Sequence, residues 1–242
     1  MSYQLLLIVA IVPVIILLSY IYKRDIEKEP RSLLSKVFKR GCLTVIPSII
    51  FELIFGYFYN ISYINNYLII FIGTFLGVGL IEEFFKWLNV YKTTYNNIEF
   101  NHRYDAIVYS VYSSLGFAVV ENVLYVLPSD LSTGIMRAFL SVPGHACDSV
   151  LMGYFLGKAK YNDIHGKKFL SYINLLLSIL IPSIQHTIYD SILFYVNINS
   201  EENILYEIFL VFVLITYLVS FLIVKTVSSI NKNMDGSYVR YY

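Results

Sequence analysis

The sequence predicts an all-α membrane protein: a polytopic bundle of about seven transmembrane helices, with the N-terminus outside and the C-terminus inside the cell. Three observations support this class. Hydrophobic residues make up 57% of the 242 residues and charged residues only 14%, whereas about a quarter of a soluble domain is charged. The apolar residues gather into runs of about 20, the length that a helix needs to cross a bilayer. The basic residues between these runs fall on one side of the predicted membrane.

The apolar runs define the expected elements in order. The predicted spans cover residues 4–22, 41–60, 67–90, 104–127, 134–157, 169–196 and 204–225. The first run lacks the basic flank and the small-residue cleavage site of a removable signal peptide, so we expect it to be retained as a helix. The gaps near residues 60–66, 128–133 and 197–203 are short and polar. Such gaps make consecutive helices antiparallel neighbours.

The distribution of basic residues sets the predicted orientation. Of the 18 lysines and arginines, only Arg137 lies near the side that holds the three short polar gaps. Basic residues are enriched in cytoplasmic loops. This distribution predicts an N-out, C-in protein.

Composition also bounds the organisation and the partners. The chain contains no internal repeat and no low-complexity linker, so we expect one integral membrane domain over residues 1–242. The net charge of +1 gives no reason to expect a nucleic-acid partner. Cys42 and Cys147 lie far apart in apolar runs and are interpreted as small core residues. The lipid bilayer is the first expected partner.

The adjacent carboxylates Glu82 and Glu83 mark the third span as functional. A carboxylate in the middle of a membrane helix costs roughly 2.5 to 3.5 kcal/mol on insertion scales, so such a pair must face a protein interior, a water cavity or a partner. Lys86 lies three and four residues further on, and a purely structural ion pair is the alternative. One lysine can neutralise only one of the two acids.

Further polar residues lie inside the next three spans. Glu121 is in the fourth span, His145 and Asp148 are in the fifth, and His186 and Asp190 are in the sixth. Each histidine has an aspartate three or four residues further on, where a carboxylate can orient the imidazole. Glutamate and two histidines are ligand types of a catalytic zinc ion, which keeps a fourth position open for water.

Four motifs on successive spans resemble those of the PrsW family of intramembrane proteases. They are Glu-Glu-x-x-Lys at 82–86, Phe-x-x-x-Glu-Asn at 117–122, His145, and His-x-x-x-Asp at 186–190. The resemblance covers residues 67–196, the expected catalytic core. The family belongs to a superfamily with the CAAX prenyl endopeptidases. Glu121 replaces a histidine of that branch, and Lys86 lies one residue earlier than its arginine, so the chain is more similar to PrsW.

The resemblance implies a site-1 protease in the bacterial cell membrane. Such a protease cuts a single-pass anti-sigma factor on its outer side and so activates an extracytoplasmic-function sigma factor. In this interpretation Glu82 or Glu83 activates water, and Glu121, His145 and His186 hold zinc. The expected supporting residues are Lys86, Asn122, Asp148 and Asp190. A metal-free mechanism that uses glutamate and histidine stays open.

Other functions also stay open at this point. Intramembrane glutamate, histidine and aspartate residues build proton and cation relays, so an ion- or proton-coupled transporter is the main alternative. A CAAX-endopeptidase-like processing protease and an inactive scaffold are two more. At about 1.5 Å per residue from the outer helix ends, Glu121 lies roughly 9 Å deep but Glu82 about 22 Å deep. A common site therefore requires a kink or break in the third span, which Gly73, Gly77 and Gly79 permit.

Overall fold

The computed structural model describes residues 3–59, 66–198 and 203–233, and this part of the chain contains helices and no strand. The helices are α1 (Tyr3–Arg24), α2 (Arg31–Phe58), α3 (Tyr67–Thr74), the π-helix η1 (Phe75–Gly79), α4 (Leu80–Thr94), α5 (Arg103–Val126), α6 (Leu131–Phe139), α7 (Ser141–Ile164), α8 (Lys168–Ile198) and α9 (Asn203–Asn233). The predicted all-α class is confirmed.

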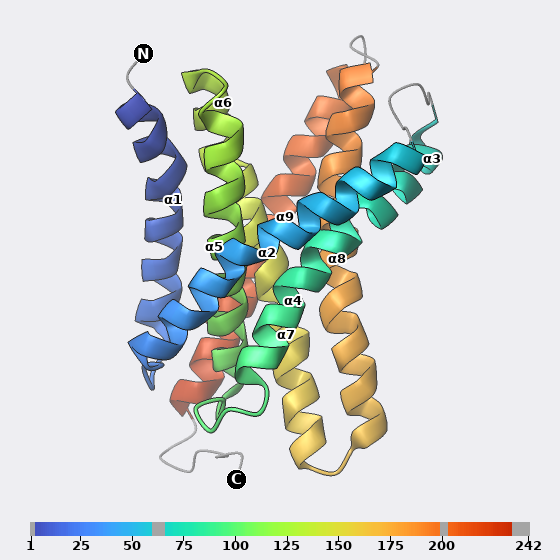
Figure 1. Cartoon of the computed structure of the whole chain (residues 1–242). Helices are drawn as coiled ribbons and strands as arrows, with labels where there is room; N and C mark the ends of the chain where they lie inside the picture. Colours follow the sequence, from blue (N-terminus) through green and yellow to red (C-terminus); the bar gives the residue numbers. More distant parts are fainter. Residues whose placement is uncertain (1–2, 60–65, 199–202, 234–242) are drawn as a thin grey trace.

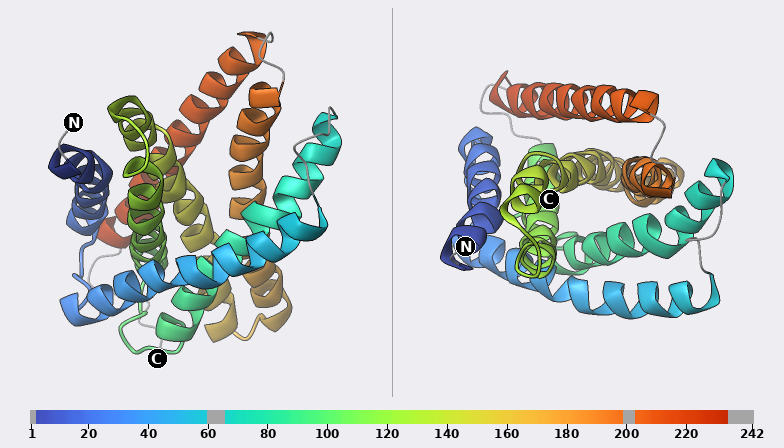
Figure 2. Two further views of the ribbon diagram at one scale, coloured as in Figure 1. Left: turned by 45° about the horizontal axis from the view of Figure 1, so that its top comes forward. Right: turned by 90° about the horizontal axis from the view of Figure 1, so that it is seen from above.

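The helices form a bundle with α5 and α7 in its interior (Figure 1). Seen from above, α2 and α9 lie on opposite outer faces, and α4, α5, α7 and α8 lie between them (Figure 2). The first half of α5 is almost entirely buried, and small residues permit its close packing. A Cβ at Gly153 of α7 would lie 2.5 Å from the Cα of Ile107, so only glycine permits this approach of α7 to α5.

Six helices in the described part of the chain are long and apolar enough to cross a membrane, which confirms a polytopic membrane protein. The first helix begins at the end of the bundle opposite to the end where α9 finishes (Figure 1), so the chain crosses an odd number of times. Helix α7 is not among these six, and its polar residues include His145 and Asp148. We infer that α7 is the remaining crossing. A helix enclosed by other helices can carry such residues without exposing them to lipid.

The predicted fifth span, residues 134–157, is not one helix. Helix α6 ends at Phe139 and α7 begins at Ser141. Pro143 is the reason, because proline has no N–H and its ring clashes with the carbonyl four residues earlier, here that of Phe139. The hydroxyl of Tyr217 on α9 donates to the carbonyls of Phe139 and Leu140, at 2.5 and 3.3 Å.

The second span begins ten residues before its predicted start, at Arg31 and not at residue 41. Four of the basic residues expected in the first loop, Arg31, Lys36, Lys39 and Arg40, instead lie in the first turns of α2. One of them, Arg40, donates to the hydroxyl of Thr93 at 2.9 Å. The helix therefore continues beyond the apolar run, where its side chains contact the end of α4.

The third span contains the irregularity that the depth of Glu82 requires. Residues 75–79 form a π-helix between α3 and α4. A Cβ at Gly79 would lie 2.4 Å from Thr187 Oγ1 and 2.8 Å from the carbonyl oxygen of Ser183, so the third span packs directly against α8 here. This contact places the first turn of α4, which carries Glu82 and Glu83, beside α8.

Candidate active site

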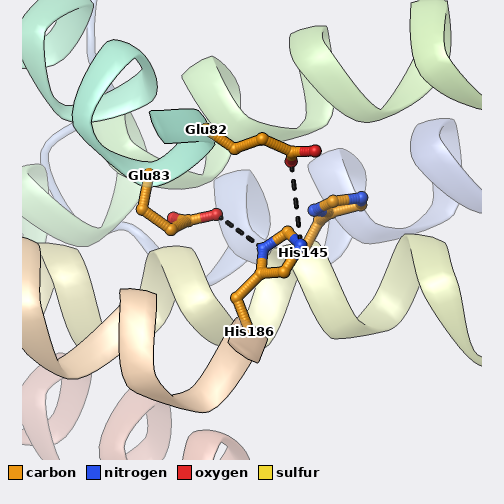
Figure 3. A group of neighbouring side chains, drawn as sticks. All are labelled: Glu82, Glu83, His145 and His186. Atoms are coloured by element: carbon orange, nitrogen blue, oxygen red, sulfur yellow. Dashed lines mark hydrogen bonds and ion pairs between the residues drawn. The ribbon is translucent and has the colours of Figure 1, made fainter. Parts of the chain in front are cut away.

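Four polar side chains from three helices meet in the interior of the bundle (Figure 3). Glu82 and Glu83 come from the first turn of α4, His145 from the start of α7 and His186 from the middle of α8. All four are buried, and each offers a ligand atom that lies within 4.8 Å of the other three. The structure thus gathers side chains from a stretch of more than a hundred positions, from Glu82 to His186.

Lys86 connects three members of this cluster. Its Nζ donates to Glu82 Oε2 at 2.9 Å and to Glu83 Oε1 at 2.8 Å, and lies 3.2 Å from His145 Nδ1. The ammonium group also lies 4.0 Å from the ring centre of Phe117. Because an ammonium group only donates, Nδ1 of His145 is its acceptor, and Nε2 carries the proton of the neutral ring. The ion pair that the sequence left as an alternative is present, but it is part of the cluster.

Glu121 lies on the other side of His145, outside the group of four. Its Oε2 accepts from His145 Nε2 at 2.8 Å and lies 3.1 Å from Nη2 of Arg137. Arg137 also donates through Nε to Asn122 at 2.7 Å, and Asn122 donates to the Ala10 carbonyl. The expected metal set of Glu121, His145 and His186 therefore does not match the cluster, where Glu82 and Glu83 accompany the two histidines.

The two aspartates do not divide between the two histidines as expected. Asp190 lies 3.2 Å from His186 Nε2, but Asp148 lies 3.5 Å from His186 Nδ1. Gln185 donates to the other oxygen of Asp148 at 2.8 Å. A separation of three residues rotates Asp148 about 60° away from His145 on α7, and α7 packs against α8 on that side. The expectation that Asp148 orients His145 is wrong.

His186 is surrounded by carboxylates. In addition to the two aspartates, Glu83 Oε1 lies 3.1 Å from Nδ1 and Glu82 Oε2 lies 3.8 Å from Nε2 (Figure 3). Both ring nitrogens therefore have acceptors, an arrangement that suits a doubly protonated imidazolium. A metal ion at either nitrogen would take the place of one N–H.

The cluster opens on a cavity of about 600 Å³, a volume typical of ligand sites. Glu82, Glu121, His145 and His186 border it, whereas Glu83 is completely buried. The opposite wall is apolar and comes mainly from α9, through Phe209, Leu210, Phe212, Val213 and Tyr217. A polar wall that faces an apolar wall suits an extended peptide segment with apolar side chains.

Among the residues at this cavity that were not singled out from the sequence as site residues are Glu52, Arg137 and Gln185. The signal for Glu52 was available, because it is a carboxylate inside the predicted second span and carries the same cost as Glu82. Arg137 stood out as the one basic residue near the outer side. Nothing in the local pattern marks Gln185, whose role depends on the packing of α7 against α8.

The chemistry of the cluster fits a metal ion. Two carboxylates and two imidazoles are the ligand types of catalytic zinc sites and of related transition-metal sites. With Lys86 as the only ammonium in direct contact among the described residues, the two glutamates leave one net negative charge for a divalent cation. Such an ion would share the two carboxylates with Lys86. At His145 it would take the place of the Lys86 ammonium, because Nδ1 has a single lone pair.

Comparison with known proteins identifies the family. The family model described as PrsW family intramembrane metalloprotease matches residues 29–222. The chain belongs to this family. The PrsW match includes every helix from α2 to α8 and most of α9, so it covers the whole cluster and its cavity.

Curated PrsW relatives resemble the chain over most of its length. "Protease PrsW" of Oceanobacillus iheyensis is 41% identical over 183 residues, which are 76% of this chain and 80% of the relative. The protein of the same name from Halalkalibacterium halodurans is 37% identical over 78% of this chain and 83% of its own. The one from Bacillus subtilis is 36% identical over 76% and 80%. No solved structure matches. The protein is therefore a multi-pass intramembrane protease of the PrsW family.

Proposed function

We propose that this protease cuts a single-pass membrane anti-sigma factor in its outer juxtamembrane segment, the site-1 step that leads to release of an extracytoplasmic-function sigma factor. The observation that carries the proteolytic part is the position of Glu82, a buried carboxylate beside two histidines at the wall of a cavity. The nature of the substrate is supported by the motif resemblance. We also propose residues 67–196 as the catalytic core of a single domain over residues 1–242.

Glu82 is the general base in this proposal. It borders the cavity, where it can accept a proton from the water that attacks a peptide carbonyl. The 2.9 Å bond from Lys86 holds its carboxylate in place. Glu83 has a different role, because it is completely buried and contacts Lys86 and His186.

The proposed metal is zinc, with Glu83, His145 and His186 as its three protein ligands. This set leaves Glu82 free to act as a base, and three protein ligands with one open position are typical of catalytic zinc sites. Zinc supplies Lewis acidity and makes water acidic enough to lose a proton near neutral pH. The alternative is a metal-free reaction in which Glu82 and a histidine activate water.

Two groups of residues hold the histidines in the proposed site. Arg137 and Glu121 hold His145 through Nε2, and Asp190 and Asp148 hold His186. Residues that contact ligating histidines in this way fix the ring orientation and the tautomer. We therefore assign them positioning roles.

The decisive experiment uses purified protein in lipid vesicles with a single-pass substrate that carries a different tag at each end. We expect the wild-type protein to produce a new terminus in the outer juxtamembrane segment, and Glu82→Gln to produce none. A chelator should stop the reaction and zinc should restore it. Glu207→Gln is the matched control, because Glu207 is exposed on α9.

Other outcomes would count against specific parts of the proposal. A cut on the cytoplasmic side would contradict the proposed site of cleavage. Activity that survives chelation, in protein free of metal, would favour the metal-free reaction. If no substrate is cut while the vesicles show a proton or cation flux that depends on Glu82, the chain is a transporter.

A further inference from the structure

Glu52 is a carboxylate that α2 directs into the cavity. It borders the same cavity as Glu82 and Glu121. Its helix, α2, lies on the outer face of the bundle opposite to α9 (Figure 2). Its neighbours Phe51 and Leu53 are 52% and 69% exposed. The helix therefore presents apolar side chains on its outer surface and one acid on its inner surface.

Glu52 differs from the other carboxylates of the cavity in having no partner. Its Oε1 is buried and has no hydrogen-bond partner among the described residues. The other carboxylates of this wall are all engaged: Glu82 by Lys86, Glu121 by Arg137 and His145, Asp148 by Gln185, and Asp190 by His186. One acid in the cavity is thus left unsatisfied.

The cations around the cavity do not supply the missing partner. The ammonium group of Lys86 is shared between Glu82 and Glu83, and the guanidinium of Arg137 contacts Glu121 and Asn122. An ionisable residue inside a membrane protein is costly, and such residues usually face a transport or substrate path. No cation of the described residues pairs with Glu52, so its partner can come from a molecule that enters the cavity.

We propose that Glu52 is a specificity-determining residue that pairs with a lysine or arginine side chain of the substrate. The inference rests on the proposed proteolytic function. Because Glu52 and Glu82 border one cavity, the recognised side chain belongs within a few residues of the bond that is cut. The apolar wall from α9 receives the neighbouring side chains of the same segment.

The test is a charge exchange between protease and substrate. Lysine, glutamine or glutamate is placed in turn at each of the four positions on both sides of the cut, and kcat/KM is measured in a maltoside detergent, which has no cationic headgroup. We expect one position where lysine gives cleavage about tenfold faster than glutamine, because a cationic side chain can pair with the Glu52 carboxylate and a neutral amide cannot. Glu52→Gln should bring this ratio close to one, and Glu52→Lys should favour glutamate. Glu207→Gln should keep the wild-type ratio.

A second readout separates failure of this inference from failure of the proposed function. Binding of the same fluorescent substrates to Glu82→Gln is measured without cleavage. If the wild-type protein cuts nothing but lysine strengthens binding through Glu52, the proposed function fails and the charge recognition stands. If the wild-type protein cuts all substrates at one rate, or if Glu52→Gln keeps the wild-type preference or loses all cleavage, Glu52 is not a specificity-determining residue.

Discussion

Lys86 is the residue on which the electrostatics of the site depend. Its completely buried ammonium group holds two adjacent carboxylates and a histidine together. Lys86→Met should lower the free energy of unfolding by about 3 to 5 kcal/mol, because it leaves buried charges without a partner. Thermal or denaturant unfolding in detergent measures this loss.

Lys168→Met is the matched control for Lys86→Met. Lys168 is 66% exposed in its ion pair with Asp163, and exposed pairs contribute little to stability because water and salt screen them. Equal losses for the two variants would show that the buried network adds nothing to stability.

Metal content distinguishes between the ligand set expected from the sequence and the cluster in the structure. We expect purified protein to contain about one equivalent of zinc, and His145→Ala, His186→Ala and Glu83→Gln to lose it, since removing one ligand weakens a three-residue site. Glu121→Gln should keep the metal with reduced affinity, because residues that only orient a ligand typically contribute 10- to 100-fold. Elemental analysis measures both outcomes. Complete loss of zinc in Glu121→Gln would restore Glu121 as a ligand.

The sequence identified the acidic pair and the two histidines because such residues are costly in a membrane, a rule that needs no structure. The rule does not say which residues meet. Asp148 was assigned to His145 on its own helix, but the rotation of α7 turns it toward His186. Contacts between helices depend on helix rotation and tilt, which the periodicity of one segment does not determine.

At the scale of elements, the π-helix of the third span positions Glu82 and Glu83, which lie in the helical turn that follows it. Gly79→Ala should reduce cleavage and cost about 1 to 3 kcal/mol, because the added Cβ would lie 2.4 Å from Thr187 and force α4 away from α8. Gly56→Ala is the control, since nothing lies within 4 Å of a Cβ at Gly56 on α2. Cleavage rates and unfolding midpoints measure both effects. Identical behaviour of the two variants would contradict a close contact at Gly79.

The segment between α1 and α2 predicts a pH dependence of stability. Burial raises the pKa of Glu29 to about 8, although Tyr109 donates a hydrogen bond to its carboxylate and opposes this rise. Burial likewise raises the pKa of Asp25 to about 6, against the opposing effect of the Glu29 backbone N–H. Between about pH 4 and pH 8 the folded protein therefore holds protons that the unfolded chain releases, so stability falls as the pH rises.

The Glu29→Gln variant tests this dependence. It should lose most of the fall in unfolding midpoint between pH 5 and pH 8.5, because glutamine does not titrate. Glu207→Gln should keep the wild-type pH profile, since its side chain is exposed. A profile of Glu29→Gln that matches the wild type would show that Glu29 is charged in the folded protein.

Apolar runs predicted where helices lie much better than where they end or break. Hydropathy marks the residues that lie within the bilayer, but a helix can extend into the water on either side. Helix α2 does so, because it begins at Arg31, before its apolar run. The division into α6 and α7 could have been suspected from Pro143. The π-helix could not, because Gly73, Gly77 and Gly79 permit a tilt, a kink or a break equally well.

At the scale of the whole molecule, the orientation in the membrane remains a prediction. Helix α1 begins and α9 ends at opposite ends of the bundle (Figure 1), so these two helix ends are expected on different sides of the membrane. A fluorescent protein fused to the C-terminus should fluoresce, and a periplasmic-type phosphatase at the same position should stay inactive, because basic loops stay in the cytoplasm. The reverse result would place the cluster on the other side of the bilayer midplane.

The π-helix also has a consequence for how length changes affect this chain. A π-turn contains about one residue more than an α-turn. Deleting one residue from 75–79 would therefore turn the wide turn into an ordinary α-turn and leave α3 and α4 in nearly the same rotation about the helix axis. A one-residue deletion from a regular helix such as α5 would instead rotate its two parts by about 100° relative to each other. The third span can thus differ by one residue between related chains without moving Glu82 away from its histidines.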